Sequence, residues 1–77
     1  MRAEQIAQMT LDDLAAFPKR TVGTAIAAHF METDRWNVTL MARQGILPFP
    51  KSQYWFSGNR LHIVKDSLLQ MFGRNPS

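Results

Sequence analysis

The stretch that decides the fold is TVGTAIAAHFMETDRWNVTLMARQG, residues 21–45. Val22, Ile26 and Phe30 are spaced four apart in it, which predicts a helix over residues 22–31 with these side chains on one face. The threonine before this helix is a suitable N-cap. Alanines fill most of the other positions, and such small side chains allow a second helix to approach closely. The pattern predicts one half of a compact helix pair.

The second half follows after a break. Thr33 or Asp34 can accept hydrogen bonds from the free N–H groups at the start of a helix that runs over residues 34–44. Gly45 can end that helix in the left-handed conformation, and the prolines that come next prevent it from resuming. Two adjacent helices joined by a short turn are therefore expected.

A β-hairpin is predicted after these helices. Residues 53–57 and 60–64 alternate as strands do, and they flank the two-residue loop Gly58-Asn59, in which a leading glycine favours a type II′ turn. The expected register pairs Phe56 with Leu61 and Tyr54 with Ile63 on an apolar face, and Ser57 with Arg60, Trp55 with His62 and Gln53 with Val64 on a mixed face. An isolated hairpin is only marginally stable, so the apolar face must lie on the helices.

Shorter helices are expected at both ends of the chain. Thr10 and Asp13 have the spacing of a capping box, and Pro18 ends the helix that the box begins. Residues 3–9 form either a short helix or a frayed start. Asp66 is the expected cap of a last helix whose Leu and Phe side chains point inward and which ends at a glycine.

The composition allows one domain. With 77 residues, 45% of them hydrophobic, and no cysteine, the chain is too short for a second core and must be stabilised by packing alone. It lacks a signal-peptide pattern and an apolar stretch that could cross a bilayer, so a cytoplasmic location is expected. The expected division is an N-terminal helical extension over residues 1–20, a folded domain over 21–73 and a tail over 74–77.

The predicted fold class is mainly α with a small β-hairpin. The order of two helices, a turn and a hairpin is that of a winged helix-turn-helix domain, although a generic α+β mini-domain has the same order.

Charge is distributed unevenly along the chain. Residues 1–18 hold one arginine and three acidic residues, whereas residues 19–77 hold eight lysines or arginines and three acidic residues. Lysine and arginine supply most of the sequence-independent affinity for DNA, so a polyanion is a reasonable partner for the basic part. The alternative is a basic surface that only promotes solubility.

The second helix of the pair has the composition of a DNA-recognition helix. At 100° per residue, Arg35, Thr39 and Arg43 form one polar stripe, with Ala42 beside it. Arginine can bond guanine bidentately, and a short side chain permits close approach to a base. The remaining arc, expected to be buried, holds Trp36, Asn37, Val38, Leu40 and Met41.

The mixed face of the hairpin is the second candidate contact surface. The residues expected to reach a minor groove or the phosphate backbone are Lys51, Asn59, Arg60 and His62. Trp55 lies among them, and we expect its indole to be buried against a neighbouring element.

The segment GILPFPK, residues 45–51, followed by an aromatic strand, Gly58, a second strand and a short Leu/Phe helix, resembles the phage and mobile-element excisionases. These belong with the MerR-like winged-helix domains. The resemblance covers residues 21–72 and implies that residues 22–31 are the first helix of the motif, 34–44 the recognition helix and 53–64 the wing. The N-terminal extension and the apolar recognition helix depart from the family pattern.

The resemblance also implies a function. Excisionases are non-enzymatic, architectural proteins that bind neighbouring sites on double-stranded DNA, often cooperatively, bend the DNA and bias an integrase toward excision; some repress transcription. It implies major-groove contacts for Arg35, Thr39 and Arg43, and minor-groove or phosphate contacts for Asn59 and Arg60. A homodimer or cooperative array and an integrase partner are further expectations from it.

Catalysis has little support in the sequence. His29 and His62 lie on different predicted elements, and no cysteine or clustered acid completes a metal site, so neither a metal nor a cofactor is expected. Asp12 and Asp13 serve better as first-turn carboxylates than as an acid/base pair. The competing function is a small phage-type protein-interaction module, an inhibitor or assembly factor, that presents Trp36 and Trp55 in an apolar Trp/Phe surface.

Overall fold

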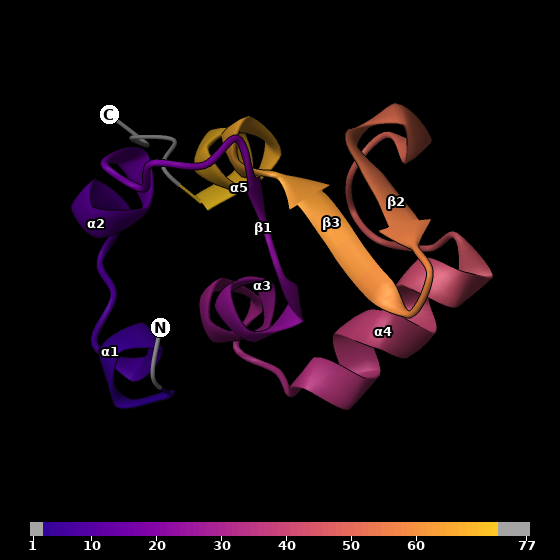
Figure 1. Cartoon of the computed structure of the whole chain (residues 1–77), viewed down its shortest axis with the longest axis horizontal. Helices are drawn as coiled ribbons and strands as arrows, with labels where there is room; N and C mark the ends of the chain where they lie inside the picture. The colour runs from indigo at the N-terminus through magenta and orange to yellow at the C-terminus, as the bar shows by residue number, and fades with distance from the viewer. Residues whose placement is uncertain (1–2, 73–77) are drawn as a thin grey trace.

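The computed structural model describes residues 3–72. They form a mainly helical α+β fold in which a small antiparallel sheet packs against the helices (Figure 1). The elements in chain order are α1 (Ala3–Ala7), α2 (Leu11–Ala15), β1 (Thr21–Val22), α3 (Thr24–Met31), α4 (Arg35–Gln44), the 3-10 helix η1 (Lys51–Gln53), β2 (Tyr54–Ser57), β3 (Arg60–Val64) and α5 (Lys65–Phe72).

The hairpin forms with the predicted register over four pairs. Tyr54 pairs with Ile63 and Phe56 with Leu61, so the apolar side chains share one face. Gly58 has φ 64°, and no positive φ occurs at Asn59, as a type II′ turn requires. The fifth predicted pair, Gln53 with Val64, is wrong because the residue before Tyr54 belongs to η1.

A third strand, β1, was not expected. Thr21 pairs with Val64 and Val22 with Ile63, giving the sheet order β1-β3-β2. The prediction of Thr21 as a helix cap and Val22 as the first helical residue is therefore wrong, since α3 begins after Gly23. Both residues are β-branched and suit a strand, but a two-residue strand is too short to show alternation.

The turn between α3 and α4 is three residues long. Glu32 ends α3 in the left-handed region (φ 56°, ψ 44°), which costs a non-glycine residue conformational energy. The Asp34 carboxylate accepts a hydrogen bond from the backbone N–H of Asn37 at 2.7 Å and so begins α4, as predicted. Gly45 ends α4 with φ 70°, also as predicted.

The N-terminal helices pack on the rest of the molecule. Thr10 and Asp13 form both hydrogen bonds of the predicted capping box, at 2.9 and 3.2 Å. Leu14 is completely buried in the common core. The ring of His29 on α3 makes a 2.8 Å hydrogen bond to the carbonyl of Met9. Residues 3–20 thus share the core of the domain that follows them.

The last helix also joins this core. Lys65 donates from Nζ to the carbonyls of Ala15 (3.3 Å) and Phe17 (2.8 Å), which links α5 to the end of α2. Leu68 is fully buried, while Leu69 and Phe72 are partly buried, so the inward face is as predicted. The helix begins at Lys65 rather than at the expected Asp66 cap. The predicted end at Gly73 and the tail 74–77 lie outside the described residues.

One core therefore connects all the elements. The elements are arranged around α3, with α1 and α2 on one side and α4 on the other, beside the hairpin turn (Figure 1). Its buried apolar residues are Met9, Leu14, Val22, Ile26, Ala27, Ala28, Val38, Ala42, Leu47, Phe49, Tyr54, Leu61, Ile63 and Leu68.

Glu32 and Gly45 end α3 and α4 in the same left-handed conformation, so substitutions at the two positions should change the stability of the fold in opposite directions. Glu32→Gly removes the penalty on a side chain at φ 56° and should raise the free energy of unfolding by ~0.5–1 kcal/mol. Gly45→Ala should lower it by ~1–2 kcal/mol, because a Cβ at φ 70° would also lie 3.1 Å from Lys51 Cε. Urea denaturation of both variants measures the changes, and a shift of the same sign in both would contradict this account of the turns.

Candidate nucleic-acid interface

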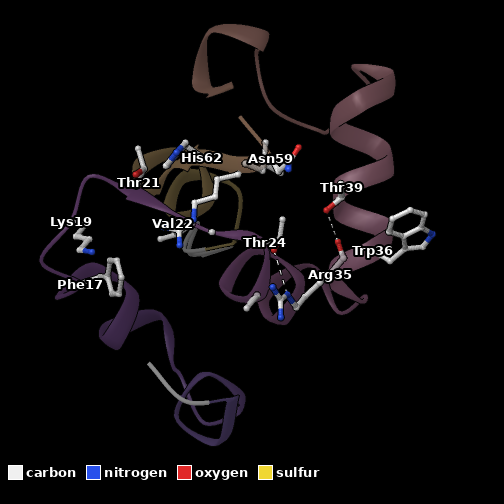
Figure 2. Close-up of a pocket in the computed structure, with 14 residues that line it drawn as sticks. Phe17, Lys19, Thr21, Val22, Thr24, Arg35, Trp36, Thr39, Asn59 and His62 are labelled. Carbon is white, nitrogen blue, oxygen red and sulfur yellow. Dashed lines mark hydrogen bonds between the residues drawn. The ribbon is translucent and has the colours of Figure 1, made fainter. Parts of the chain in front are cut away.

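A groove with a volume of about 730 Å³ lies between α4, the start of α3, β1 and the turn of the hairpin. Five of the seven residues predicted to contact DNA line it: Arg35, Thr39, Asn59, Arg60 and His62. The first two come from α4 and the last three from the hairpin, so the fold brings the two predicted contact surfaces together. Figure 2 shows labelled residues of both elements around this groove.

No acidic residue lines the groove. Its basic residues are Lys19, Arg35 and Arg60, with His62 beside them, and threonine hydroxyls and an asparagine amide supply the other polar groups. Unopposed positive charge in a concave surface attracts polyanions, because the surrounding protein focuses the field. The groove therefore has the electrostatic character of a phosphate-binding surface.

Arg35 is anchored at the junction of two helices. Its Nε lies 3.4 Å from Thr24 Oγ1 at the start of α3, and its carbonyl accepts a 3.0 Å hydrogen bond from the Thr39 hydroxyl (Figure 2). Because Nε is one of five guanidinium donors, the terminal N–H groups stay available to a ligand. Thr39 uses its hydroxyl proton on the helix backbone and keeps its lone pairs and methyl group for other contacts.

The buried face of α4 is only partly the one predicted. Val38 is buried and Met41 packs against the core as expected, but Ala42, predicted beside the polar stripe, is buried as well. Val38 and Ala42 are the buried residues of this helix, whereas Trp36 is 69% exposed. Asn37, expected in the buried arc, is exposed and donates to Thr33 Oγ1 at 2.9 Å. Because α4 packs on the alanine-rich α3, small side chains occupy its core side, and the large indole is left in solvent.

Two predicted contact residues lie outside the groove. The guanidinium of Arg43 sits 5.3 Å from the centre of the Phe56 ring, a cation–π contact that joins α4 to β2. Lys51 lies against Gly45 at the end of the same helix. Both are exposed, but the structure does not bring them together with the other five.

Trp55 lies on the outer face of the hairpin. Its ring stacks on that of His62, with centroids 5.9 Å apart and an interplanar angle of 26°, and the residue is 47% exposed. The predicted burial of Trp55 is therefore wrong. Strand alternation explains it, because Tyr54 and Phe56 already take the inner face.

Sequence reasoning missed several groove residues, among them Lys19, Thr21, Thr24 and Trp36. Thr21 belongs to the unpredicted strand β1 and Lys19 lies just before it, and no pattern in the sequence signals either residue. The helical pattern does signal the exposure of Trp36, because on an ideal helix it points within about 20° of Arg43, a residue of the predicted polar stripe.

A second, more apolar groove of about 570 Å³ lies where α1 meets the turn between α3 and α4. Ile6 and Ala7 line one side of it, and Trp36 with Arg35 lines the other. Trp36 thus borders both grooves.

Within residues 3–72, no group of three or more His, Asp or Glu side chains could hold a metal ion. The helices of this part are also too short to cross a bilayer.

Comparison of the chain with protein-family models, with curated proteins and with solved structures found no match. Its function is therefore inferred from the groove itself.

The Arg43–Phe56 contact predicts a measurable coupling. Arg43→Gln and Phe56→Leu should each destabilise the fold, and the double variant should lose ~0.5–1 kcal/mol less than the sum, because the cation–π contact can be lost only once. Urea denaturation of the four proteins completes the cycle. Arg20→Gln, which removes the same charge without removing this contact, should be additive with Phe56→Leu; equal coupling in both cycles would contradict a specific interaction.

Proposed function

We propose that this protein is a non-enzymatic, sequence-specific binder of double-stranded DNA, of winged helix-turn-helix type. The observation that carries the proposal is the groove that unites α4 and the hairpin turn around Lys19, Arg35 and Arg60 without one acidic side chain. DNA is the polyanion whose major groove is wide enough to admit an α-helix.

In this mode α4 enters the major groove and the hairpin acts as the wing. The first turn of a recognition helix reaches furthest toward the base edges, and Arg35 and Thr39 lie in the first half of α4. Asn59 and Arg60, at the tip of the hairpin, then face the phosphate backbone or the adjacent minor groove. The helix supplies the sequence preference, and the wing fixes the orientation of the protein.

The biological role that fits this mode is that of a small architectural factor or transcriptional regulator, like the excisionases. A recognition surface of one short helix and one hairpin is small, so we expect binding to adjacent sites as a dimer or cooperative array. An integrase bound to the same DNA is the expected protein partner if the role is excision.

Salt dependence tests the proposal. With about four to six phosphate contacts, affinity for DNA should fall by roughly 10²–10³-fold between ~50 and ~200 mM salt. Fluorescence polarisation with a random-sequence duplex and with the DNA upstream of the coding sequence measures this fall. Tighter, salt-sensitive binding to the upstream duplex supports a sequence-specific regulator, whereas no binding at the lower salt overturns the proposal.

Charge-matched variants separate the groove from net charge. Arg60→Gln and Gln8→Glu each lower the net charge by one, but only Arg60 lines the groove, and Gln8 is exposed elsewhere. Loss of one phosphate contact should make the logarithmic salt slope of Arg60→Gln shallower by about 0.9, with little change for Gln8→Glu. An equal effect of both substitutions would contradict binding through the groove.

A protein-interaction module is the second candidate, favoured by the apolar groove between α1 and Trp36. Binding through an apolar interface should change little with salt. If the chain fails to bind duplex DNA at low salt and instead binds a protein partner with weak salt dependence, this candidate replaces the first.

A further inference from the structure

Trp36 has no evident role in folding. It is the second residue of α4 and is 69% exposed, more than any other large hydrophobic residue of the described part. It belongs neither to the buried core nor to the partly buried residues packed against it. A single exposed indole is common on protein surfaces, but this one lines the same groove as Arg35 and Thr39, which makes it available to a ligand bound there.

Trp36 lies beside the polar residues that α4 contributes to the groove. Trp36 and Thr39 are three residues apart on α4, and both line the groove. The Arg35 side chain reaches back toward Thr24, whereas the indole points in another direction (Figure 2). Under the proposed function, the first turn of α4 is the part of the helix that lies deepest in the major groove.

The other exposed tryptophan is less available. One face of the Trp55 ring is already covered by the stacked His62 ring, and Trp55 lies on the hairpin. Trp36 has no ring contact of this kind among the described residues. Of the two indoles, that of Trp36 is therefore the better candidate for reading a base.

Thymine is the base that suits both the apolar edge and the donor of an indole. In the major groove only thymine presents a methyl group, and its O4 acceptor lies next to that methyl. An indole offers a large apolar edge and a single donor, Nε1–H, and has no acceptor. The N7 acceptors of adenine and guanine also suit the indole N–H, but neither base presents a methyl group to its apolar edge. Cytosine presents an amino donor that an indole cannot accept.

We propose that Trp36 is a specificity-determining residue that selects thymine in the major groove, through apolar contact with the methyl group and donation from Nε1 toward O4. This inference rests on the proposed function, because it requires α4 to lie in the major groove.

The test begins by identifying a site. Selection from a random-sequence duplex library with the wild-type chain should enrich a thymine at one position, and selection with Trp36→Ala should lose that preference while other positions are kept. Because Trp36 is exposed and outside the core, Trp36→Ala should unfold at the same temperature as the wild type, which circular dichroism checks.

Removal of one methyl group then tests the contact directly. Deoxyuridine in place of the selected thymine should weaken wild-type binding about fourfold, the effect of one buried methyl-sized group. The same replacement should leave the affinity of Trp36→Ala unchanged, whereas Trp55→Ala, the matched control, should keep the fourfold loss.

The outcomes distinguish this inference from the proposed function. If the wild type binds the selected duplex with salt sensitivity but does not distinguish thymine from deoxyuridine, or if Trp36→Ala distinguishes them equally well, thymine selection by Trp36 is overturned and DNA binding stands. If the wild type binds no duplex at low salt, both proposals fail.

Discussion

Close packing around α3 is the constraint on which the rest of the structure depends. This helix contacts α1, α4, α5 and β3, and it can do so because Ala27 and Ala28 are small and almost completely buried. Interiors are packed to near-crystalline density, so a larger side chain at either position would push a neighbouring element away. This packing also determines the shape of the groove, because α3 contacts both α4 and β3 and so fixes how the helix lies relative to the hairpin.

The groove is lined both by apolar residues of the core and by exposed basic residues. Two of the residues that line it, Val22 and Leu61, also belong to the core, while the basic side chains of Lys19, Arg35 and Arg60 are exposed around it. Folding therefore gathers cations that are far apart in sequence without burying any of them, so their mutual repulsion stays screened by solvent. A polyanion would supply the countercharge that the fold leaves out.

Local rules predicted the parts of the structure that local chemistry determines. The capping box at Thr10, the end of α4 at Gly45 and the hairpin register all depend on residues within a few positions of one another.

The predictions that proved wrong concern features that depend on contacts between elements far apart in the sequence. Strand β1 exists only because β3 offers it partners 41 and 43 residues later in the chain, and the exposure of Trp36 depends on which side of α4 meets α3. Five of the residues predicted to contact DNA line one groove, because the order of helix and hairpin places them on adjacent elements, whereas Arg43 and Lys51 lie at the far end of α4.

The two-residue strand β1 supports the hairpin only at its base. Pairing at Thr21 and Val22 clamps β3 only at Ile63 and Val64, so the segment from Ser57 to Arg60 projects beyond the clamp as two strands alone. The three-stranded base leads directly into the start of α3, whereas the tip has no third strand beside it. If the hairpin acts as the proposed wing, its tip is the part whose distance from α4 would adjust to DNA grooves of different width, against the resistance of the ladder between β2 and β3.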